Sequence, residues 1–262
     1  MEKLNIGLSI VLPTINEEKN LRYLIPEIVQ VLNNEYISEY EIIVVDDGSS
    51  DETESLISNL SSKNSKIKLL KRTGNPSLPM SIWDGIELSK QKYVMWLDAD
   101  GSMTSKGVHS IIQKLIENED SVIIGSRFVD GGGYKGIEID NKSIFSAFQK
   151  VYKSEDSVLA VLLSRFFNKI IYLFLNCGVK DVTSGFIVGK KSYFEKSIFS
   201  VANYGDYFVY LIKDLKVKDI NMIEVGYICE TRKYGESKSG TSFYILLKRA
   251  LPYFKAAFKV IK

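Results

Sequence analysis

Two aspartates one residue apart, Asp98 and Asp100, follow an apolar run that is long enough for one buried strand. Side chains at positions i and i+2 of a strand share a face, so both carboxylates can converge just beyond the strand end. Open α/β sheets bind their ligands outside the carboxyl ends of their strands. Two hard oxygen ligands at such a place suit Mg²⁺ or Mn²⁺ that also contacts substrate phosphates. An isolated Asp-x-Asp pair is equally compatible with a surface loop. The residues at the other strand ends must therefore distinguish a metal site from such a loop.

Two further predicted strands, 6–12 and 41–45, also end in acidic or polar turns. These turns are Pro13-Thr14-Ile15-Asn16-Glu17 and Asp46-Asp47-Gly48-Ser49. A single turn of this kind usually caps the next helix, and Asn16 is the expected N-cap of a helix that extends to about residue 33. Three such turns at one sheet edge favour a nucleotide site, in which Asp46 or Asp47 accepts a hydrogen bond from a base or ribose. The distance from there to a metal-bound diphosphate fits a nucleotide diphosphate-sugar.

Alternating strand and helix patterns in the first half of the chain predict an α/β fold with a mostly parallel, doubly wound sheet. The next expected elements are strands at 67–70, 93–97 and 121–125, with helices near 52–62, 79–89 and 104–117. Beyond them we expect a polar loop at 134–142, an apolar helical segment at 143–176, a helix near 205–214 and a strand near 220–228. We predict one catalytic domain over 1–240 and a C-terminal helix over 241–262.

The charge is divided unevenly along the chain. The net charge is +2, but residues 231–262 contribute +7 and the remainder −5. A basic tail suits an anionic partner, which phosphate groups, anionic lipid or nucleic acid can supply. Residues 243–262 have an amphipathic pattern, which Pro252 should kink or split. Such a helix suits a membrane interface, and packing on the body or on a second subunit is the alternative.

Composition excludes several classes of protein. The chain of 262 residues has one histidine and two widely spaced cysteines, so a histidine-ligated metal centre is excluded and a reducing, cytosolic compartment is expected. No uninterrupted apolar run reaches the roughly 18 residues that a membrane-spanning helix requires. The first residues also lack the basic start and the cleavage site of a signal peptide.

A second group of candidate residues is cationic and comprises Arg127, Arg165, Arg232 and Lys238. Arg127 directly follows an apolar strand and Arg165 interrupts an apolar helical segment, where an unpaired charge is unfavourable. Each could extend its guanidinium to solvent or pair with a structural acid such as Asp181 or Glu224. Guanidinium groups also match phosphate bidentately, which favours a second phosphate site beside the Asp-x-Asp pair. The residues alone leave both interpretations open.

Six motifs that occur in a fixed order carry a family resemblance. They are Pro13-Thr14-Ile15-Asn16-Glu17, Asp46-Asp47-Gly48-Ser49, Asp98-Ala99-Asp100, Gly125-Ser126-Arg127, Asp181-Val182-Thr183-Ser184-Gly185-Phe186 and Arg232 followed by Gly235-Glu236-Ser237-Lys238. The set closely resembles the family 2 glycosyltransferases of the Rossmann-like GT-A fold, and within them the polyprenyl-phosphate branch that is similar to dolichyl-phosphate mannose synthase. The resemblance extends over about 10–240. The first three motifs are common to the wider family, and the last three are more specific.

The resemblance implies an inverting hexose transfer from a nucleotide diphosphate-sugar, of the GDP-mannose or UDP-glucose type, to a polyprenyl or dolichyl phosphate. The residues that it implies for the donor are Pro13, Asn16, Glu17, Asp46, Asp47, Arg72 and Asp98. Those implied for the acceptor phosphate are Arg127, Arg165, Ser184, Arg232, Ser237 and Lys238. Asp98, Asp100 and Arg127 would serve catalysis. Mg²⁺ or Mn²⁺ would be held by Asp98, Asp100 and Ser102, although relatives commonly have a glutamine at the position of Ser102.

The same resemblance implies that the protein acts at the cytoplasmic face of a membrane. Many relatives carry transmembrane helices after the catalytic domain, and because none follows here we expect peripheral contact, no nucleic acid partner, and either a monomer or a homo-oligomer. Two alternatives stay open. A family 2 enzyme could glycosylate a saccharide or protein hydroxyl, which would require a carboxylate base near the sugar. A nucleotide-sugar-binding subunit without activity is the other alternative.

Overall fold

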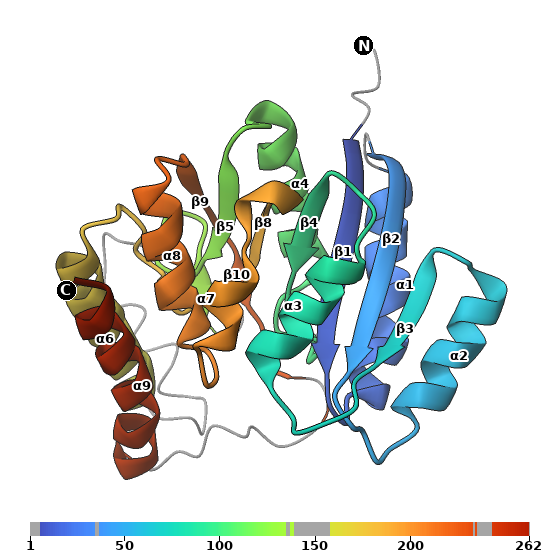
Figure 1. The fold of residues 1–262 in the computed structure, drawn as a ribbon, viewed down its shortest axis with the longest axis horizontal. Helices are drawn as coiled ribbons and strands as arrows, with labels where there is room; N and C mark the ends of the chain where they lie inside the picture. The colour runs from blue at the N-terminus through green and yellow to red at the C-terminus, as the bar shows by residue number, and fades with distance from the viewer. Residues whose placement is uncertain are drawn as a thin grey trace.

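A seven-stranded sheet between two layers of helices forms the body of the protein (Figure 1). The computed structural model describes residues 6–34, 37–134, 137–138, 158–232, 234 and 243–261. The strand order is β3-β2-β1-β4-β8-β5-β9. The strands are β1 (Ile6–Thr14), β2 (Ile37–Asp46), β3 (Ile67–Lys71), β4 (Tyr93–Trp96), β5 (Val122–Ser126), β8 (Ile187–Lys190) and β9 (Met222–Gly226). Only β8 pairs antiparallel within this sheet, between β4 and β5. The mostly parallel α/β architecture expected from the sequence is therefore confirmed.

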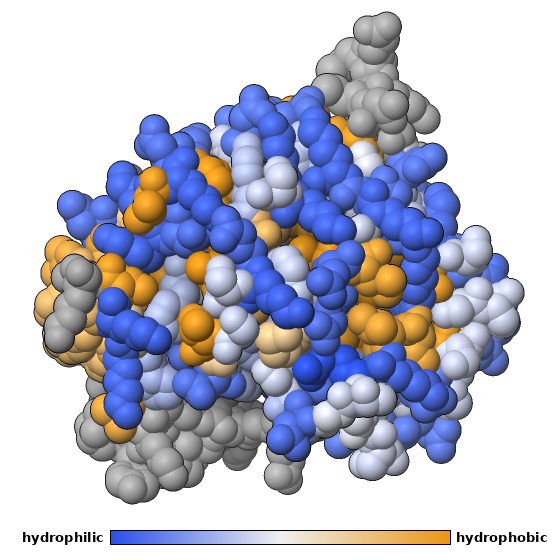
Figure 2. All heavy atoms as spheres, viewed as in Figure 1, coloured by the Kyte–Doolittle hydropathy of each residue, from blue (hydrophilic) through white to orange (hydrophobic). Residues whose placement is uncertain are grey.

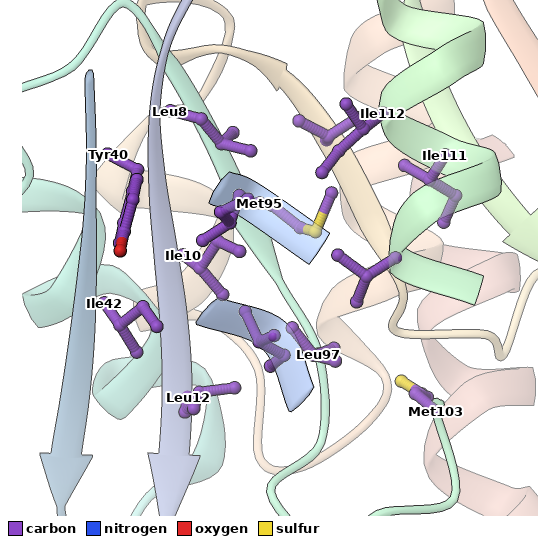
Figure 3. Close-up of a cluster of buried hydrophobic side chains, with 14 of the residues drawn as sticks. Leu8, Ile10, Leu12, Tyr40, Ile42, Met95, Leu97, Met103, Ile111 and Ile112 are labelled. Carbon is purple, nitrogen blue, oxygen red and sulfur yellow. The ribbon is translucent and has the colours of Figure 1, made fainter. Parts of the chain in front are cut away.

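Helices cover both faces of the sheet, and the strands are accordingly apolar on both sides. The helices are α1 (Glu18–Asn34), α2 (Thr53–Lys63), α3 (Leu78–Leu88), α4 (Ser105–Glu117), α6 (Val158–Leu175), α7 (Lys196–Ser200), α8 (Tyr207–Val217) and α9 (Phe243–Ile261). Ile10 and Met95 face the core beneath α1 and α4, which Figure 3 shows in close-up. Val11 and Trp96, one position further along their strands, face the core beneath α3, α7 and α8. This alternation follows from the two-residue period of a strand.

The start of α1 differs from the prediction, because Asn16 is not its N-cap. Asn16 has a φ of 56°, and the helix begins only at Glu18. The first helical amides are capped from the next loop instead, since the Glu18 N–H donates to Asp51 Oδ2 at 3.1 Å and the Glu17 N–H to Thr53 Oγ1 at 3.3 Å. Asparagine tolerates the left-handed conformation better than most residues, which frees its side chain to bond the neighbouring loop.

A second, small sheet lies where a polar loop was predicted. It joins β10 (Ile228–Cys229), β6 (Gly133–Tyr134) and β7 (Ile137–Glu138). A Cβ atom on Gly226 would lie 2.2 Å from the Asp130 carbonyl oxygen, so the segment before β6 can pass the end of β9 only at a glycine. The prediction of a loop over 134–142 was wrong for the strand residues: β7 pairs with the neighbouring β6, and β6 in turn pairs with β10, which is remote in the sequence.

The C-terminal helix α9 packs against α6 and α8, and Figure 1 shows α6 and α9 side by side at one edge of the molecule. The Phe167 ring of α6 meets the rings of Tyr253 at 5.7 Å and Phe254 at 4.9 Å. Helix α9 continues through Pro252 without dividing, contrary to one of the two expected outcomes. Within the described residues, no helix is long and apolar enough to cross a membrane.

Candidate active site

Asp98 and Asp100 lie immediately past the carboxyl end of β4 and line a cavity of about 230 Å³. The cavity is enclosed by the turns after β1 and β2, the start of α3, the segment after β10 and the loop before α8. Its predicted members are Pro13, Glu17, Asp47, Asp98, Asp100 and Arg232. Its other lining residues are Thr14, Ile15, Pro76, Ser77, Leu78, Ser81, Ala99, Asn203 and Tyr204. Because the strands are parallel, three separate strand ends meet here, as the sequence pattern suggested.

The two aspartates have different surroundings. Asp100 is buried; its Oδ1 accepts a hydrogen bond from the Ser102 N–H at 2.9 Å, and its Oδ2 lies 2.8 Å from Arg232 Nε. Burial, and then the nearby charge of Asp100, raise the pKa of Asp98 to about 7, while Arg232 and Arg127 act in the opposite direction. The pair therefore carries more negative charge than its protein surroundings offset, which is the condition that a bound cation relieves.

The chemistry of this pair fits a divalent metal ion. No group of three or more histidine, cysteine, aspartate or glutamate side chains that could hold a metal occurs in the described part of the chain. Two carboxylates suffice for Mg²⁺ or Mn²⁺, because such ions retain water and complete their shell with substrate phosphates. Ser102 donates a hydrogen bond to Asp100 through its N–H. Its role as a metal ligand stays a prediction.

The donor wall, formed by the turns after β1 and β2, is held together by hydrogen bonds of its own. Asp47 pairs with Arg72 through Oδ1 and accepts the Ser77 N–H through Oδ2 at 2.5 Å. The Arg72 Nε donates in turn to Asp84 at 2.7 Å. Of the two adjacent aspartates offered by the sequence, Asp47 lines the cavity, with both carboxylate oxygens already engaged. Arg72 acts on the cavity through Asp47.

Asp46 and Asn16 join the two turns of the donor wall from behind. Asp46 is buried, and its Oδ1 accepts both the N–H and the hydroxyl of Ser49. The Ser49 hydroxyl also accepts the Asn16 N–H at 2.8 Å, and the Asn16 side-chain oxygen accepts the Ser50 N–H at 2.7 Å. These contacts fix the shape of the wall. A direct contact of either residue with a donor stays a prediction.

Arg127 pairs with a structural acid, and its role in binding a phosphate stays a prediction. Its guanidinium makes two parallel hydrogen bonds to buried Asp181, at 2.8 and 2.7 Å, and a third to Thr183 Oγ1 at 2.9 Å. The side chain is only 12% exposed. Arg127 is thus paired with a structural acid, and its charge reaches the cavity through space, since it lowers the pKa of Asp98.

Arg165 differs from Arg127. It is half-buried on α6, and within the described residues it forms no ion pair. Its guanidinium lies 6.0 Å from the centre of the Phe128 ring, which Arg127 approaches at 5.3 Å. Burial lowers the pKa of Arg165 from its usual value.

The remaining predicted acceptor residues fall into three situations. Arg232 contacts Asp100 directly, on the cavity itself. The Ser184 hydroxyl donates to the Gly125 carbonyl and accepts the Phe186 N–H at 3.2 Å, so it joins β5 to β8. Ser237 and Lys238 lie outside the described residues.

Sequence reasoning missed the loop before α8, which contributes Asn203 and Tyr204 to the cavity. The loop carries no charged motif of its own at the cavity. Its Asn-Tyr-Gly-Asp composition is nevertheless typical of a turn, and the Asp206 carboxylate accepts the N–H groups of Asn203 at 3.0 Å and Tyr204 at 2.8 Å. The signal was therefore one of local structure, and only the fold brings the turn to the cavity.

Comparison with known proteins establishes the family. The model named Glycosyl transferase family 2 matches residues 9–198, and the chain belongs to this family. A dolichyl-phosphate beta-glucosyltransferase of Dictyostelium discoideum is 34% identical over 132 residues, which cover 47% of this chain and 40% of the relative. A dolichol-phosphate mannosyltransferase of Pyrococcus furiosus is 29% identical over 230 residues, or 88% of this chain and 58% of the relative. The chain spans about half the length of these curated relatives.

Solved structures establish the fold. Glucosyl-3-phosphoglycerate synthase from Mycobacterium tuberculosis, in complex with Mn²⁺, UDP and phosphoglyceric acid, has a TM-score of 0.63 at 15% identity, covering 98% of this chain and 78% of that chain. Its complex with Mg²⁺ and UDP has a TM-score of 0.58 at 14% identity, covering 98% and 79%. The GT-A fold is thereby confirmed. These neighbours in the fold were crystallised with Mn²⁺ or Mg²⁺ and UDP.

Proposed function

We propose that this chain transfers a hexose, with inversion, from a nucleotide diphosphate-sugar to a polyprenyl phosphate. The observation that carries the proposal is the cavity at the strand ends, where Asp98 and Asp100 face the donor wall and Arg232. The names of the two curated relatives support a lipid phosphate as the acceptor. The donor is of the GDP-mannose or UDP-glucose type.

The donor lies between the wall and the aspartates. Asp47 and Glu17 line the part of the cavity that receives the base and ribose. A carboxylate can accept hydrogen bonds from the N–H groups of a base and the hydroxyl groups of a ribose. Asp98 and Asp100 hold Mg²⁺ or Mn²⁺, which when bound neutralises the charge of the donor diphosphate. Ser102 keeps Asp100 oriented through its N–H. Arg232 adds a positive charge at the same carboxylate, where the leaving diphosphate develops negative charge.

The acceptor needs positioning more than activation. A phosphate monoester is already anionic near neutral pH, so one of its oxygens can attack the anomeric carbon without a strong base. A bond forms between that carbon and the acceptor oxygen while the bond to the donor diphosphate breaks, and the nucleoside diphosphate leaves. Arg165 binds the acceptor phosphate, because its charge has no acidic partner among the described residues. Arg127 supports the site from its fixed position beside Asp181.

Peripheral attachment to the cytoplasmic face of a membrane belongs to the same proposal. Helices α6 and α9 expose large apolar side chains at helical spacing, and Figure 2 shows apolar surface at the edge where these helices lie. These side chains are Phe166, Leu173, Phe174, Leu251 and Phe258. The Phe174 and Phe258 rings are 5.7 Å apart, so the two helices form one apolar face, which we call the α6–α9 face. Exposed Lys169 and Lys255 can bind anionic headgroups beside it.

A transfer assay tests the reaction. The purified protein is incubated with Mn²⁺, radiolabelled GDP-mannose or UDP-glucose, and polyprenyl phosphate in detergent; a saccharide acceptor is assayed in parallel. We expect labelled lipid with one donor, and loss of roughly 100-fold or more in rate for Asp100→Asn. Asp120→Asn, at an 88% exposed aspartate before β5, is the matched control and should retain the rate. Labelled saccharide without labelled lipid would overturn the acceptor, and Asp100→Asn at full rate would overturn the metal role.

Flotation with anionic liposomes tests the membrane contact. The double variant Leu173→Ser, Phe258→Ser should lose most of the liposome binding of the wild type, because it removes apolar surface from both helices of the α6–α9 face. Val217→Ser changes an equally exposed apolar residue on α8 and serves as control. Unchanged flotation of the double variant would overturn membrane docking through this face, and a dimeric mass in solution would assign the face to a second copy.

A further inference from the structure

The loop before α8, residues 203–206, forms one wall of the donor cavity and is fixed by three contacts. Within the loop, the buried Asp206 carboxylate holds the N–H groups of Asn203 and Tyr204, the two residues that line the cavity. At its end, the Tyr207 hydroxyl accepts the Trp96 indole N–H at 3.0 Å. Trp96 is the last residue of β4, the strand that leads into Asp98. This hydrogen bond ties the loop to the strand that carries the aspartates.

The third contact of the loop comes from the C-terminal helix. A Cβ atom on Gly205 would lie 2.0 Å from the Tyr253 hydroxyl and 3.0 Å from Tyr253 Cζ, so the tyrosine of α9 rests directly on the backbone of the loop. Tyr253 also contacts the Phe167 ring of α6, which meets it edge-on at 5.7 Å and 90°. The loop is therefore clamped between β4 and the α6–α9 pair.

We infer that Tyr253 is a positioning residue for the nucleotide-sugar cavity, because it sets the position of Asn203 and Tyr204 through Gly205. The inference rests on the proposed function, since it takes the cavity as the donor site. It gives α9 a part in donor binding that is separate from its exposed apolar side chains. Donor affinity should accordingly depend on a helix whose described side chains, those of residues 251–260, are not among the cavity-lining residues.

Two substitutions and their combination test the inference. Gly205 does not have a positive φ, so Gly205→Ala introduces the clash with Tyr253 without backbone strain. Tyr253→Phe removes the hydroxyl that would be struck and keeps the ring against Phe167. Affinity is measured by calorimetric titration of the full chain with UDP and with GDP, each with Mn²⁺. Gly205→Ala should weaken nucleotide binding about tenfold. The combined variant should recover most of that loss, because the closest clashing atom is gone.

The rescue separates positioning from general stability. Lys259→Ala, at an exposed residue of α9, should leave nucleotide affinity unchanged and serves as the control. Wild-type affinity in Gly205→Ala, or a loss that Tyr253→Phe does not relieve, would overturn the inference while the proposed function stands. If neither UDP nor GDP binds the wild-type protein, the proposed function fails and the inference fails with it.

Discussion

The donor wall and the two arginines Arg127 and Arg165 are held in different ways. In the donor wall, the carboxylates of Asp46 and Asp47 are each satisfied by partners from the adjoining loops. Among the cations, Arg127 is locked on Asp181, whereas Arg165 has no acidic partner within the described residues. Residues whose bonds are complete define the shape of the site. A cationic side chain that has no acidic partner among the described residues can bind an anionic ligand.

This comparison predicts its largest effect at Arg127. Arg127→Met leaves Asp181, which is fully buried, without its partner, and should lower the free energy of unfolding by about 3–5 kcal/mol. Urea denaturation followed by circular dichroism measures the change. In the double variant Arg127→Met, Asp181→Asn the buried charge is gone, so the loss should be smaller. A loss under about 1 kcal/mol in the single variant would mean that the ion pair is not holding this region.

In the donor wall we expect an intermediate effect from Asp47→Asn. The change removes the charge that pairs with Arg72, although the amide oxygen can still accept the Ser77 N–H. The free energy of unfolding should fall by about 1–3 kcal/mol, and nucleotide binding should weaken as well. Asp84→Asn, which removes the other and more exposed partner of Arg72, should cost less. Equal losses in the two variants would contradict the ranking.

The pKa of Asp98 predicts a dependence of stability on pH. Because this pKa is raised from its usual value to about 7, the folded state favours the protonated carboxyl. That stabilisation is complete below the usual pKa and is lost as the pH rises through about 7. Without divalent metal, the free energy of unfolding of the wild type should therefore fall relative to that of Asp98→Asn as the pH rises from acidic values to about 7. Parallel pH curves for the two proteins would exclude the shifted pKa.

Arg165 should have the smallest effect on stability. Because it forms no ion pair within the described residues, Arg165→Gln should change the free energy of unfolding by less than about 0.5 kcal/mol. In the Arg165→Gln variant, the KM for polyprenyl phosphate should rise about tenfold, while the KM for the nucleotide-sugar stays unchanged. A large loss of stability, or a selective loss of donor affinity, would remove the contrast with Arg127.

Much of the first half of the fold could be predicted from sequence, because the spacing of apolar residues indicates its strands and helices and turn residues mark their ends. β4 and α4 differ from their predicted ends by only one residue. The antiparallel insertion of β8 and the pairing of β6 with β10 could not be predicted, because both depend on partners remote in the chain. Local patterns carry no information about such partners.

The same division holds at the site. Asp98, Asp100 and Asp47 could be located because the ends of parallel strands meet at one edge. Asn203 and Tyr204 could not, since their loop belongs to a later part of the chain. For Arg127 the sequence named Asp181 as one option, but 54 positions separate the two residues, and only the fold selects the pair.

The ion pair between Arg232 and Asp100 also bears on the order in which the site is completed during synthesis. The donor wall and both aspartates are contained in the first hundred residues, so they can assemble while the ribosome is still translating the second half. The segment that carries Arg232 emerges later and must follow β9 across the sheet before its guanidinium can reach Asp100. A chain interrupted before this residue would present the acidic pair without its cation.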